Sequence, residues 1–515
     1  MTSGTRVTVA FRQLSRSWRQ RQVQQTYDQL QAPSRLLFRR CSTQGCCSTS
    51  ATPSFPKGGS QHRTSARGRR WRVGSPLAAT TGSWQPDMEA MSTPEGDDPH
   101  PVSRASAPLH HVLDAKGRLS GFRNPWSTEA KPPTMGELWR VWRVWDDKKG
   151  RVTPEQRRTL EAAACKPDWS LIERTDSLDA AVAATWIGHA TFILQFRNQR
   201  LEKDRASLAD GAGCSSAAGA TSTITTVYLD PVFSDRASPV SFLGPKRLVK
   251  AAPLEECPLP ELVCISHNHY DHCDVGTIRA LVARARSQNR SITWLVPLGL
   301  GPLLRDQNRI WGGWIPSSHP VHELDWFEQR TIGTLEVALV PAQHATGRSP
   351  WDRDRTLWGG WVLRHMDTNV RCYFAGDTAY RVIDESNEGY PYPTEAERQQ
   401  LAEQYPKRKP CPAFRAIGDK WGPFDLAMIP IGAYSPRWFM SRFHVDPVDS
   451  VAIHRDVRAR LSVAMHHSTF VLTDEGLGDP ERRLSDACAA AGLSESDFVV
   501  WRHGETRLVA HKPAE

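Results

Sequence analysis

Two features that mark common protein classes are missing from this chain of 515 residues. No stretch has the roughly 18 uninterrupted apolar residues of a membrane-spanning helix, so any membrane contact is expected to be peripheral. The eleven cysteines are odd in number and include no CxxC pair. Cys264 lies in an apolar run and Cys273 lies close behind it, and neither place suits a disulfide framework. We therefore predict a reducing, intracellular compartment.

Acidic residues are nearly absent from the first 86 positions. Thirteen Arg and Lys57 in that stretch face a single acid, Asp28, which gives the stretch a charge of +13. Since the whole chain carries +9, the remainder from Asp87 onward carries −4. The excess of positive charge lies in residues 1–86 alone, so an enzyme that acts on nucleic acid is not predicted.

Residues 1–105 lack apolar periodicity and are rich in Arg, Ser, Gln, Gly and Pro, which predicts a disordered leader. An Arg-rich, Ser-rich and acid-poor leader is also typical of an organellar transit peptide. Two interpretations remain open, a transit peptide into a mitochondrion or plastid and a plain basic tail. The leader has no apolar core of a secretory signal.

Residues 106–515 are predicted to form one catalytic domain that is interrupted by two inserts. The inserts, at 200–223 and 384–409, are Ala/Ser/Gly-rich and highly charged respectively. Near the start of the domain, three tryptophans over Leu138–Trp145 predict an amphipathic helix that packs on the core. The alternative is that this helix, or the loop at 436–440, meets a membrane interface.

One stretch concentrates ligands for a metal. Within Ser266–His272, the imidazoles of His267, His269 and His272 accompany the carboxylate of Asp271. Neutral imidazole and ionised carboxylate are the groups that zinc-like divalent ions bind. The apolar run 262–265 before them predicts a buried strand, so the cluster lies at the carboxyl end of a strand, where α/β proteins place their chemistry. The alternative is a solvated polar loop.

The same arrangement recurs along the chain. Asp230, His344, Asp377 and His466 each follow an apolar run that predicts a strand. A single histidine or aspartate after a strand is weak evidence, since such residues also form turns. Because strand ends in one sheet lie close together, the series predicts that these side chains join the cluster at 267–272.

Several stretches resemble the N-acyl-phosphatidylethanolamine-hydrolysing phospholipase D family of the metallo-β-lactamase superfamily. They are Trp186-Ile-Gly-His-Ala-Thr191, Asp230-Pro-Val-Phe-Ser-Asp-Arg-Ala-Ser238, Gly244-Pro-Lys-Arg247, Ile265-Ser-His-Asn-His-Tyr-Asp-His272, Pro341-Ala-Gln-His344, Ala375-Gly-Asp-Thr378, Gly422-Pro-Phe-Asp-Leu426, Ile429-Pro-Ile-Gly-Ala-Tyr434, Pro436-Arg-Trp-Phe-Met440, His444-Val-Asp-Pro447 and Ala464-Met-His466. The resemblance runs from about Phe122 to about Gly504. It implies an α/β fold, the αββα sandwich, with a dinuclear metal site between the sheets.

The resemblance also implies two Zn²⁺ ions per chain and a role for each ligand. One ion is implied at His267, His269 and His344, and the other at Asp271, His272 and His466, with Asp377 bridging the two. Asp230 is implied to orient the ligands. His444 is implied to lie near the phosphate-binding side of the cleft, and Tyr434 and Arg437 to line that cleft.

The implied activity is hydrolysis of N-acyl-phosphatidylethanolamine to N-acylethanolamine and phosphatidic acid, by attack of a hydroxide that bridges the two ions. Asp271 or His444 could protonate the leaving group, and the sequence does not choose between them. The implied partners are a phospholipid substrate and a membrane surface, and a homodimer stays open. Two alternatives also remain, a soluble hydrolase of a lactone, thioester or small phosphodiester, and an inactive metal-binding scaffold.

Overall fold

The computed structural model describes residues 108–126, 134–144, 152–175, 180–198, 224–240, 242–306, 312–349, 351–383 and 409–512. All of these residues belong to one compact unit, Gln85–Glu515. The predicted leader, the insert at 200–223 and all but the last residue of the insert at 384–409 lie outside the described residues.

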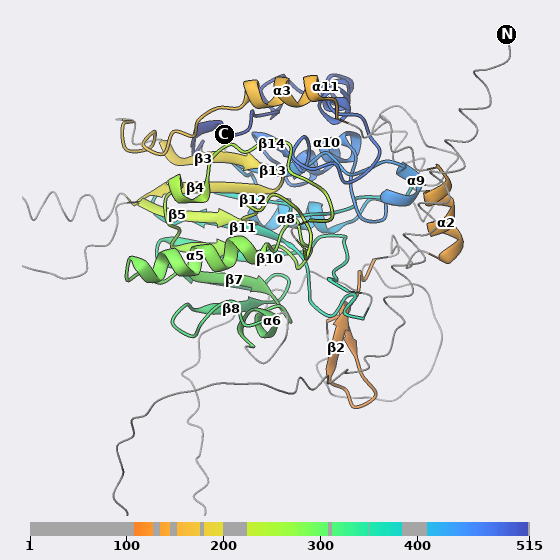
Figure 1. The fold of residues 1–515 in the computed structure, drawn as a ribbon, viewed down its shortest axis with the longest axis horizontal. Helices are drawn as coiled ribbons and strands as arrows, with labels where there is room; N and C mark the ends of the chain where they lie inside the picture. The colour runs from red at the N-terminus through yellow and green to blue at the C-terminus, as the bar shows by residue number, and fades with distance from the viewer. Residues whose placement is uncertain are drawn as a thin grey trace, which may run out of the picture. The chain divides into compact units, whose positions relative to one another are not determined.

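Two seven-stranded sheets form the centre of the unit (Figure 1). The first sheet has the order β16-β3-β4-β5-β6-β7-β8 and the second has the order β15-β14-β13-β12-β11-β10-β9. The strands of the first sheet are β3 (Ala180–Gly188), β4 (Thr191–Arg197), β5 (Ile224–Leu229), β6 (Leu262–Cys264), β7 (Thr293–Pro297), β8 (Val321–Leu324) and β16 (Thr506–Ala510). Those of the second are β9 (Gln329–Ile332), β10 (Leu335–Val340), β11 (Gly360–His365), β12 (Arg371–Phe374), β13 (Leu426–Pro430), β14 (Ser462–Met465) and β15 (Phe498–Val499).

Helices cover the outer faces of both sheets. The helix α5 (Val275–Ser287) lies on the first sheet, and α8 (Ala413–Trp421), α10 (Pro447–Asp456) and α11 (Asp479–Ala491) lie on the second (Figure 1). The order helix, sheet, sheet, helix is the metallo-β-lactamase fold, and it confirms the predicted αββα sandwich. The remaining described elements are β1 (His111–Leu113), β2 (Leu119–Phe122), α2 (Met135–Val144), α3 (Pro154–Ala163), η2 (Leu254–Glu256), α6 (Gly301–Arg305) and α9 (Arg437–Met440).

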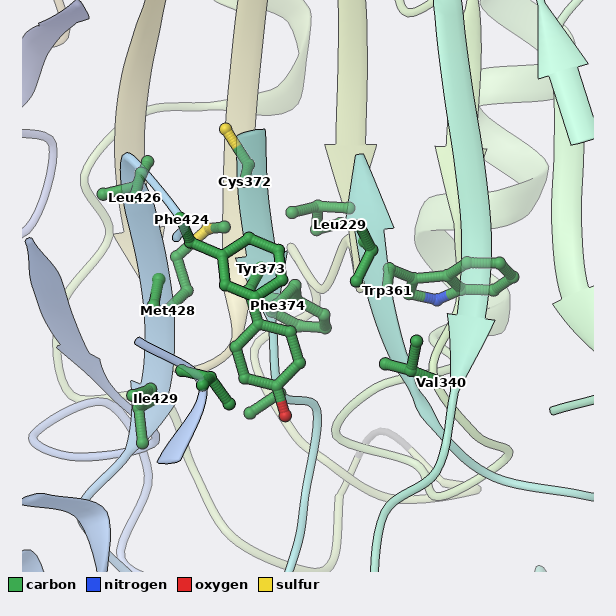
Figure 2. Packing of buried hydrophobic residues seen from close by; sticks show 14 of the residues in the cluster. Leu229, Val340, Trp361, Cys372, Tyr373, Phe374, Phe424, Leu426, Met428 and Ile429 are labelled. Carbon is green, nitrogen blue, oxygen red and sulfur yellow. The ribbon is translucent and has the colours of Figure 1, made fainter. Parts of the chain in front are cut away.

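The apolar runs form strands because both of their faces are buried. Leu262 and Cys264 of β6 join the core between the two sheets, whereas Val263 joins the outer core under α5. A parallel strand that is covered on both sides reads as a continuous apolar run, and β6 pairs in parallel with β5 and β7. Between the sheets, Leu229 of β5 faces Trp361 and Phe374 of the second sheet (Figure 2).

Capping residues set the start of the helices α5 and α10. The Asp274 carboxylate accepts a hydrogen bond from Gly276 N and so begins α5. The Asp446 carboxylate accepts from Asp449 N and begins α10, with Pro447 at its first position. Both caps directly follow segments that carry predicted site residues, so they fix where those segments end.

The tryptophan-rich helix differs from its prediction. We expected it to pack on the core, but α2 lies on the surface, with Met135 80% exposed and Trp139 56% exposed. It contacts α9, because Arg140 lies 4.8 Å over the Trp438 ring and Arg442 pairs with Glu137. The core prediction is therefore wrong, since an amphipathic pattern does not specify what its apolar face meets. None of the described helices is long and apolar enough to cross a membrane.

Candidate metal centre

Six strand ends meet at one edge of the sandwich and carry the candidate ligands. They contribute His189 after β3, Asp230 after β5, the His267–His272 loop after β6, His344 after β10, Asp377 after β12 and His466 after β14. Three of these residues have a left-handed backbone, with φ of 55° at His189, 40° at Asp230 and 63° at His466. Such angles are costly for residues other than glycine and are concentrated at functional sites.

The first group of ligands consists of His267, His269 and His344. His269 Nδ1 lies 2.8 Å from His267 Nε2 and 3.3 Å from His344 Nε2. The ring of His344 is fixed from behind, because its Nδ1 donates to the Phe443 carbonyl at 2.8 Å. Together with Asp377, these side chains present four ligand atoms within 4.8 Å of one another.

The second group contains Asp271, His272 and His466, as predicted, and also His189. Asp271 Oδ2 lies 3.7 Å from His272 Nε2 and 3.6 Å from His466 Nε2. His189 Nε2 lies 2.9 Å from the same oxygen, and its ring packs 4.0 Å from that of His466. These four ligand atoms also lie within 4.8 Å of one another.

Asp377 lies between the two groups. Its Oδ2 is 3.8 Å from His267 Nε2 and 3.1 Å from His272 Nε2, and its Oδ1 is 3.1 Å from His466 Nε2. Gly376 allows this approach, because it has φ of 60° and a Cβ there would lie 2.9 Å from Ser266 Cβ. One carboxylate therefore reaches donors of both groups, as a bridging ligand must.

The donor set fits divalent cations. His272 Nε2, Asp377 Oδ1 and His466 Nε2 are buried and have no hydrogen-bond partner, although buried polar atoms almost always find one. All three atoms face the space that the two groups enclose. Imidazole nitrogen and carboxylate oxygen are the ligands that zinc and related ions bind at about 2.0–2.2 Å. The metallo-β-lactamase fold likewise implies a divalent metal.

Asp230 holds the second group in place, as the sequence predicted. Its carboxylate accepts from His272 Nδ1 at 2.6 Å, from Ser266 N at 2.6 Å and from Ser266 Oγ at 2.5 Å. The proton on His272 Nδ1 leaves Nε2 free to bind a metal. A hydrogen bond of this kind fixes both the tautomer and the ring orientation of a ligating histidine.

Arg348, which the sequence analysis did not single out, clamps the His267–His272 loop. Its guanidinium donates to the carbonyls of Asn268 and Cys273 at 2.8 and 2.9 Å. It also lies 3.9 Å over the Tyr270 ring, and the Tyr270 hydroxyl donates to the Arg348 carbonyl. The segment after His344 thereby locks the loop that supplies half of the ligands.

The electrostatics of the two groups differ. Burial, reinforced by neighbouring imidazoles, lowers the pKa values of His267 and His344 well below the ordinary value, so both side chains are neutral donors. Burial would also lower the pKa of His466, but Asp377 and Asp271 raise it to about 9. The carboxylates therefore hold a cation at the second group, either a proton or a metal ion.

His444 lies beside both ligand groups. Its ring is 5.2 Å from that of His344 and 5.2 Å from that of His466. Its Nδ1 is buried without a hydrogen-bond partner. Burial lowers the pKa of His444 to about 4, so the imidazole is neutral at pH 7 and keeps one N–H for donation.

The two residues predicted to line the cleft are engaged elsewhere. The Tyr434 hydroxyl donates to Asp479 Oδ2 at 2.6 Å, and the side chain is 2% exposed. Arg437 is buried, pairs with Asp449 and donates to the His444 carbonyl at 2.8 Å. Their polar atoms shape the loop that carries His444, so the structure does not bring either residue to the cleft surface.

His189 is the functional residue that sequence reasoning missed. It directly follows a strand, as the other candidates do, but it stands in a Gly-His pair of the kind that also forms turns. Its backbone is held in place, since its N–H donates to Thr469 Oγ1 at 2.6 Å and its carbonyl accepts from His466 N. Burial lowers the pKa of His189 to about 3, so a neutral ring donates Nε2–H to Asp271. The signal available in the sequence was its place at a strand end.

A further group of possible ligands shares no residue with the centre and consists of His110, His111 and Asp325. His110 Nε2 lies 2.6 Å from Asp325 Oδ1, and His111 Nε2 lies 2.8 Å from Oδ2. One carboxylate thus contacts both histidines. This contact ties the hairpin β1–β2 to the segment after β8.

Comparisons with known proteins agree with this geometry. The chain matches the Beta-lactamase superfamily domain over residues 225–390 and 409–467. It is 32% identical over 335 residues to N-acyl-phosphatidylethanolamine-hydrolyzing phospholipase D 1 of Caenorhabditis elegans, which covers 64% of this chain and 76% of that protein.

Two further matches are more distant. Over 275 residues, the chain is 28% identical to N-acyl-phosphatidylethanolamine-hydrolyzing phospholipase D, mitochondrial, of Saccharomyces cerevisiae, covering 52% of this chain and 49% of that protein. Among solved structures it is similar to Igni18, a metallo hydrolase from Ignicoccus hospitalis, with 16% identity, coverage of 64% of this chain and 99% of that one, and a TM-score of 0.38. With the fold, the ligand-bearing strand ends and the nematode relative taken together, this chain belongs to the N-acyl-phosphatidylethanolamine-hydrolysing phospholipase D family of the metallo-β-lactamase superfamily, and it is a metal-dependent hydrolase.

Proposed function

We propose that this protein is a zinc-dependent phosphodiesterase that cleaves N-acyl-phosphatidylethanolamine into N-acylethanolamine and phosphatidic acid. The observation that carries the proposal is the pair of ligand groups joined by Asp377, in a chain that is 32% identical to a relative named for this reaction. His267, His269 and His344 would hold one ion, and Asp271, His272 and His466 the other. Two-metal sites of this kind are suited to displacement at phosphorus.

Bound divalent ions would lower the pKa of a water molecule held between them and neutralise the oxygens of a phosphodiester. The residues of the chain supply the geometry for that chemistry. Asp230, which accepts from the Ser266 hydroxyl, holds His272, while the Phe443 carbonyl holds His344 and His189 holds Asp271. Three of the ligands are thus fixed by a partner behind them, so this part of the site is organised before substrate arrives.

Negative charge develops on the leaving alkoxide, and the contacts favour His444 over Asp271 as the group that would donate a hydrogen bond to it, while water would supply the proton that completes the alcohol. Asp271 already accepts from His189, and although burial would raise the pKa of Asp271, His272 and His189 hold it well below the ordinary value. His444 is a neutral imidazole with a buried Nδ1 that has no partner. It lies beside both ligand groups, where the bond to the leaving group would break.

We further propose a phospholipid membrane as the place of action and a mitochondrion as the compartment. The Arg-rich, acid-poor leader and the word mitochondrial in the name of the yeast relative support that compartment. The amino terminus of protein isolated from its source tests this point, because a cleaved transit peptide predicts a mature chain that begins well after Met1.

The function is tested with purified protein whose metal content is measured before assay. Wild type is expected to hold about two ions per chain and to cleave N-acyl-phosphatidylethanolamine dispersed in mixed micelles. Asp377→Ala should lose both properties, whereas Asp325→Asn, at the separate His/Asp group, should retain both ions. Metal bound without turnover of this lipid would contradict the proposal. Turnover of a soluble aryl phosphodiester alone would favour a small-substrate hydrolase.

A further inference from the structure

Exposed apolar side chains gather on four segments that surround the metal centre. They are the hairpin β1–β2, the helix α2, the loop between β5 and η2, and the loop after His344. The large apolar residues exposed on these segments are Leu109, Val112, Leu113, Leu119, Met135, Leu138, Trp139, Phe242, Leu243 and Trp351. Elsewhere in the described part of the chain, the large apolar residues that are exposed are Met366, Val471 and Val500.

Contacts place the hairpin beside the metal ligands. Asn124 Nδ2 donates to the carbonyl of His344 at 2.9 Å. Phe122 N donates to the Asp354 carbonyl at 2.8 Å, and the Arg355 guanidinium donates to the Ser120 carbonyl at 2.7 Å. The hairpin therefore extends from the loop that carries His344.

The other segments flank the same centre. The helix α2 lies beside α9, whose loop continues to His444 (Figure 1). The loop after β5 and the loop after His344 line one cavity of about 790 Å³, which also has Tyr270 on its wall. Phe242 is 78% exposed and Trp351 is 73% exposed, so each loop presents a large apolar side chain to the outside.

Positive charge accompanies these apolar groups. The stretches 108–126, 134–144, 231–250, 345–356 and 434–446 contain fourteen Lys and Arg against six Asp and Glu. Among the other residues that the structure describes, 25 Lys and Arg face 29 Asp and Glu, so those residues carry −4. Arg247, Arg437 and Asp446 are buried, so the surplus is on groups nearer the surface. Within the described part of the chain, the segments around the metal centre are thus basic, with a charge of +8, whereas the rest is slightly acidic.

We infer that these four segments, together called the docking edge, bind an anionic phospholipid bilayer and present the metal centre to its headgroups. This inference rests on the proposed lipid substrate. Apolar side chains among basic ones are the combination that holds peripheral proteins at anionic membranes. Burial of the apolar side chains and attraction of the basic ones to anionic lipids both contribute to the binding free energy. A second copy of the chain suits the edge less well, because a symmetric contact would place like charges together.

Hydrogen exchange of the full chain, measured by mass spectrometry, tests each segment separately. Vesicle binding by the basic leader can therefore be distinguished from binding by the docking edge. On addition of vesicles of phosphatidylcholine with phosphatidylserine, we expect slower exchange in 109–122, 134–144, 238–246 and 349–353. The β11–β12 turn with Met366 should not change. Protection confined to residues 1–107, or to none of the docking edge, would overturn the inference.

A variant with the changes Leu138→Ser, Trp139→Ser, Phe242→Ser and Leu243→Ser extends the test. All four side chains are exposed, so the fold should persist, and Met366→Ser is the matched control. We expect vesicle affinity in high salt to fall at least about tenfold in the quadruple variant and to stay unchanged in the control. Unchanged vesicle affinity, or loss of a dimer with vesicle binding intact, would contradict a membrane role.

The two proposals fail in different ways. Hydrolysis in detergent micelles does not require docking, so the quadruple variant should keep micellar activity while losing activity on vesicles. If wild type cleaves no lipid in micelles but its docking edge is still protected by vesicles, the proposed reaction fails and the docking edge stands.

Discussion

The two ligand groups of the metal centre are built differently. The first is made of three imidazoles that burial keeps neutral, and two of them lie two positions apart on one loop. The second combines imidazoles with a carboxylate, and its parts come from three strand ends. The first group is thus largely organised by local chain geometry. The second depends on side chains, such as His189 and Asp230, that hold the ligands from behind.

Removal of the residue that the groups share should have the largest effect. Asp377→Ala deprives both groups of a ligand, so we expect kcat/KM to fall about 10⁴-fold, equivalent to roughly 5–6 kcal/mol. Metal analysis should show less than one ion per chain. Asp377→Asn keeps the size of the side chain and serves as the matched variant. Retention of two ions by Asp377→Ala would show that the groups are independent.

Single-group variants compare the two halves directly. His344→Ala and His466→Ala should each reduce the metal content by about one ion per chain, because each removes a ligand from one group only. Activity should fall by more than the roughly 10–100-fold that loss of an outer hydrogen-bond partner costs. Titration with metal under a chelator gives the affinity of the ion that remains. If either variant loses both ions, the two groups fill as a unit.

His189→Ala tests whether the second group depends on positioning. We expect the second ion to bind about 10–100-fold more weakly, with the first ion unaffected, because Asp271 loses the donor that fixes it. His189→Gln retains an N–H donor and should recover part of the affinity. Equal weakening of both ions would instead indicate a general loss of structure at this edge.

A buried histidine outside the centre gives the smallest expected effect. Burial lowers the pKa of His454 to about 4, whereas the unfolded chain takes up the proton near 6.5. Between these values the unfolded state binds more protons, so the free energy of unfolding decreases as pH falls. Between pH 7 and pH 5.5, this histidine should lower the free energy of unfolding by about 1 kcal/mol. Denaturant titrations at both pH values should show that this decrease in the free energy of unfolding is about 1 kcal/mol smaller in His454→Gln than in wild type. Equal decreases in the two proteins would contradict a lowered pKa for His454.

The fold and most of the metal centre could be predicted from the sequence because the same pattern indicates both. An apolar run that ends on His or Asp indicates a buried strand and also places a ligand at its end, as at Asp230, His344 and Asp377. His189 has the same position but follows a glycine, so it resembled a turn. Only its contact with Asp271, 82 residues away, shows its role.

The errors have a common physical cause. Tyr434 and Arg437 belong to stretches that resemble the family and lie close to the centre, yet their polar atoms face Asp479 and Asp449. The helix α2 shows amphipathic spacing, yet its Met135, Leu138 and Trp139 side chains are exposed. Sequence patterns indicate which residues are neighbours along the chain, but the direction of a side chain is set by partners distant in sequence.

The strand order also separates the connection between β4 and β5 from the metal ligands. The strand β4 starts at the metal edge and ends at Arg197, and β5 starts at Ile224 and returns to that edge at Asp230. The chain therefore leaves and re-enters the first sheet at the edge opposite the ligands. A fluorescent protein or affinity tag inserted between these strands would point away from the metal centre. It would offer a reporter for binding experiments that leaves the catalytic edge open.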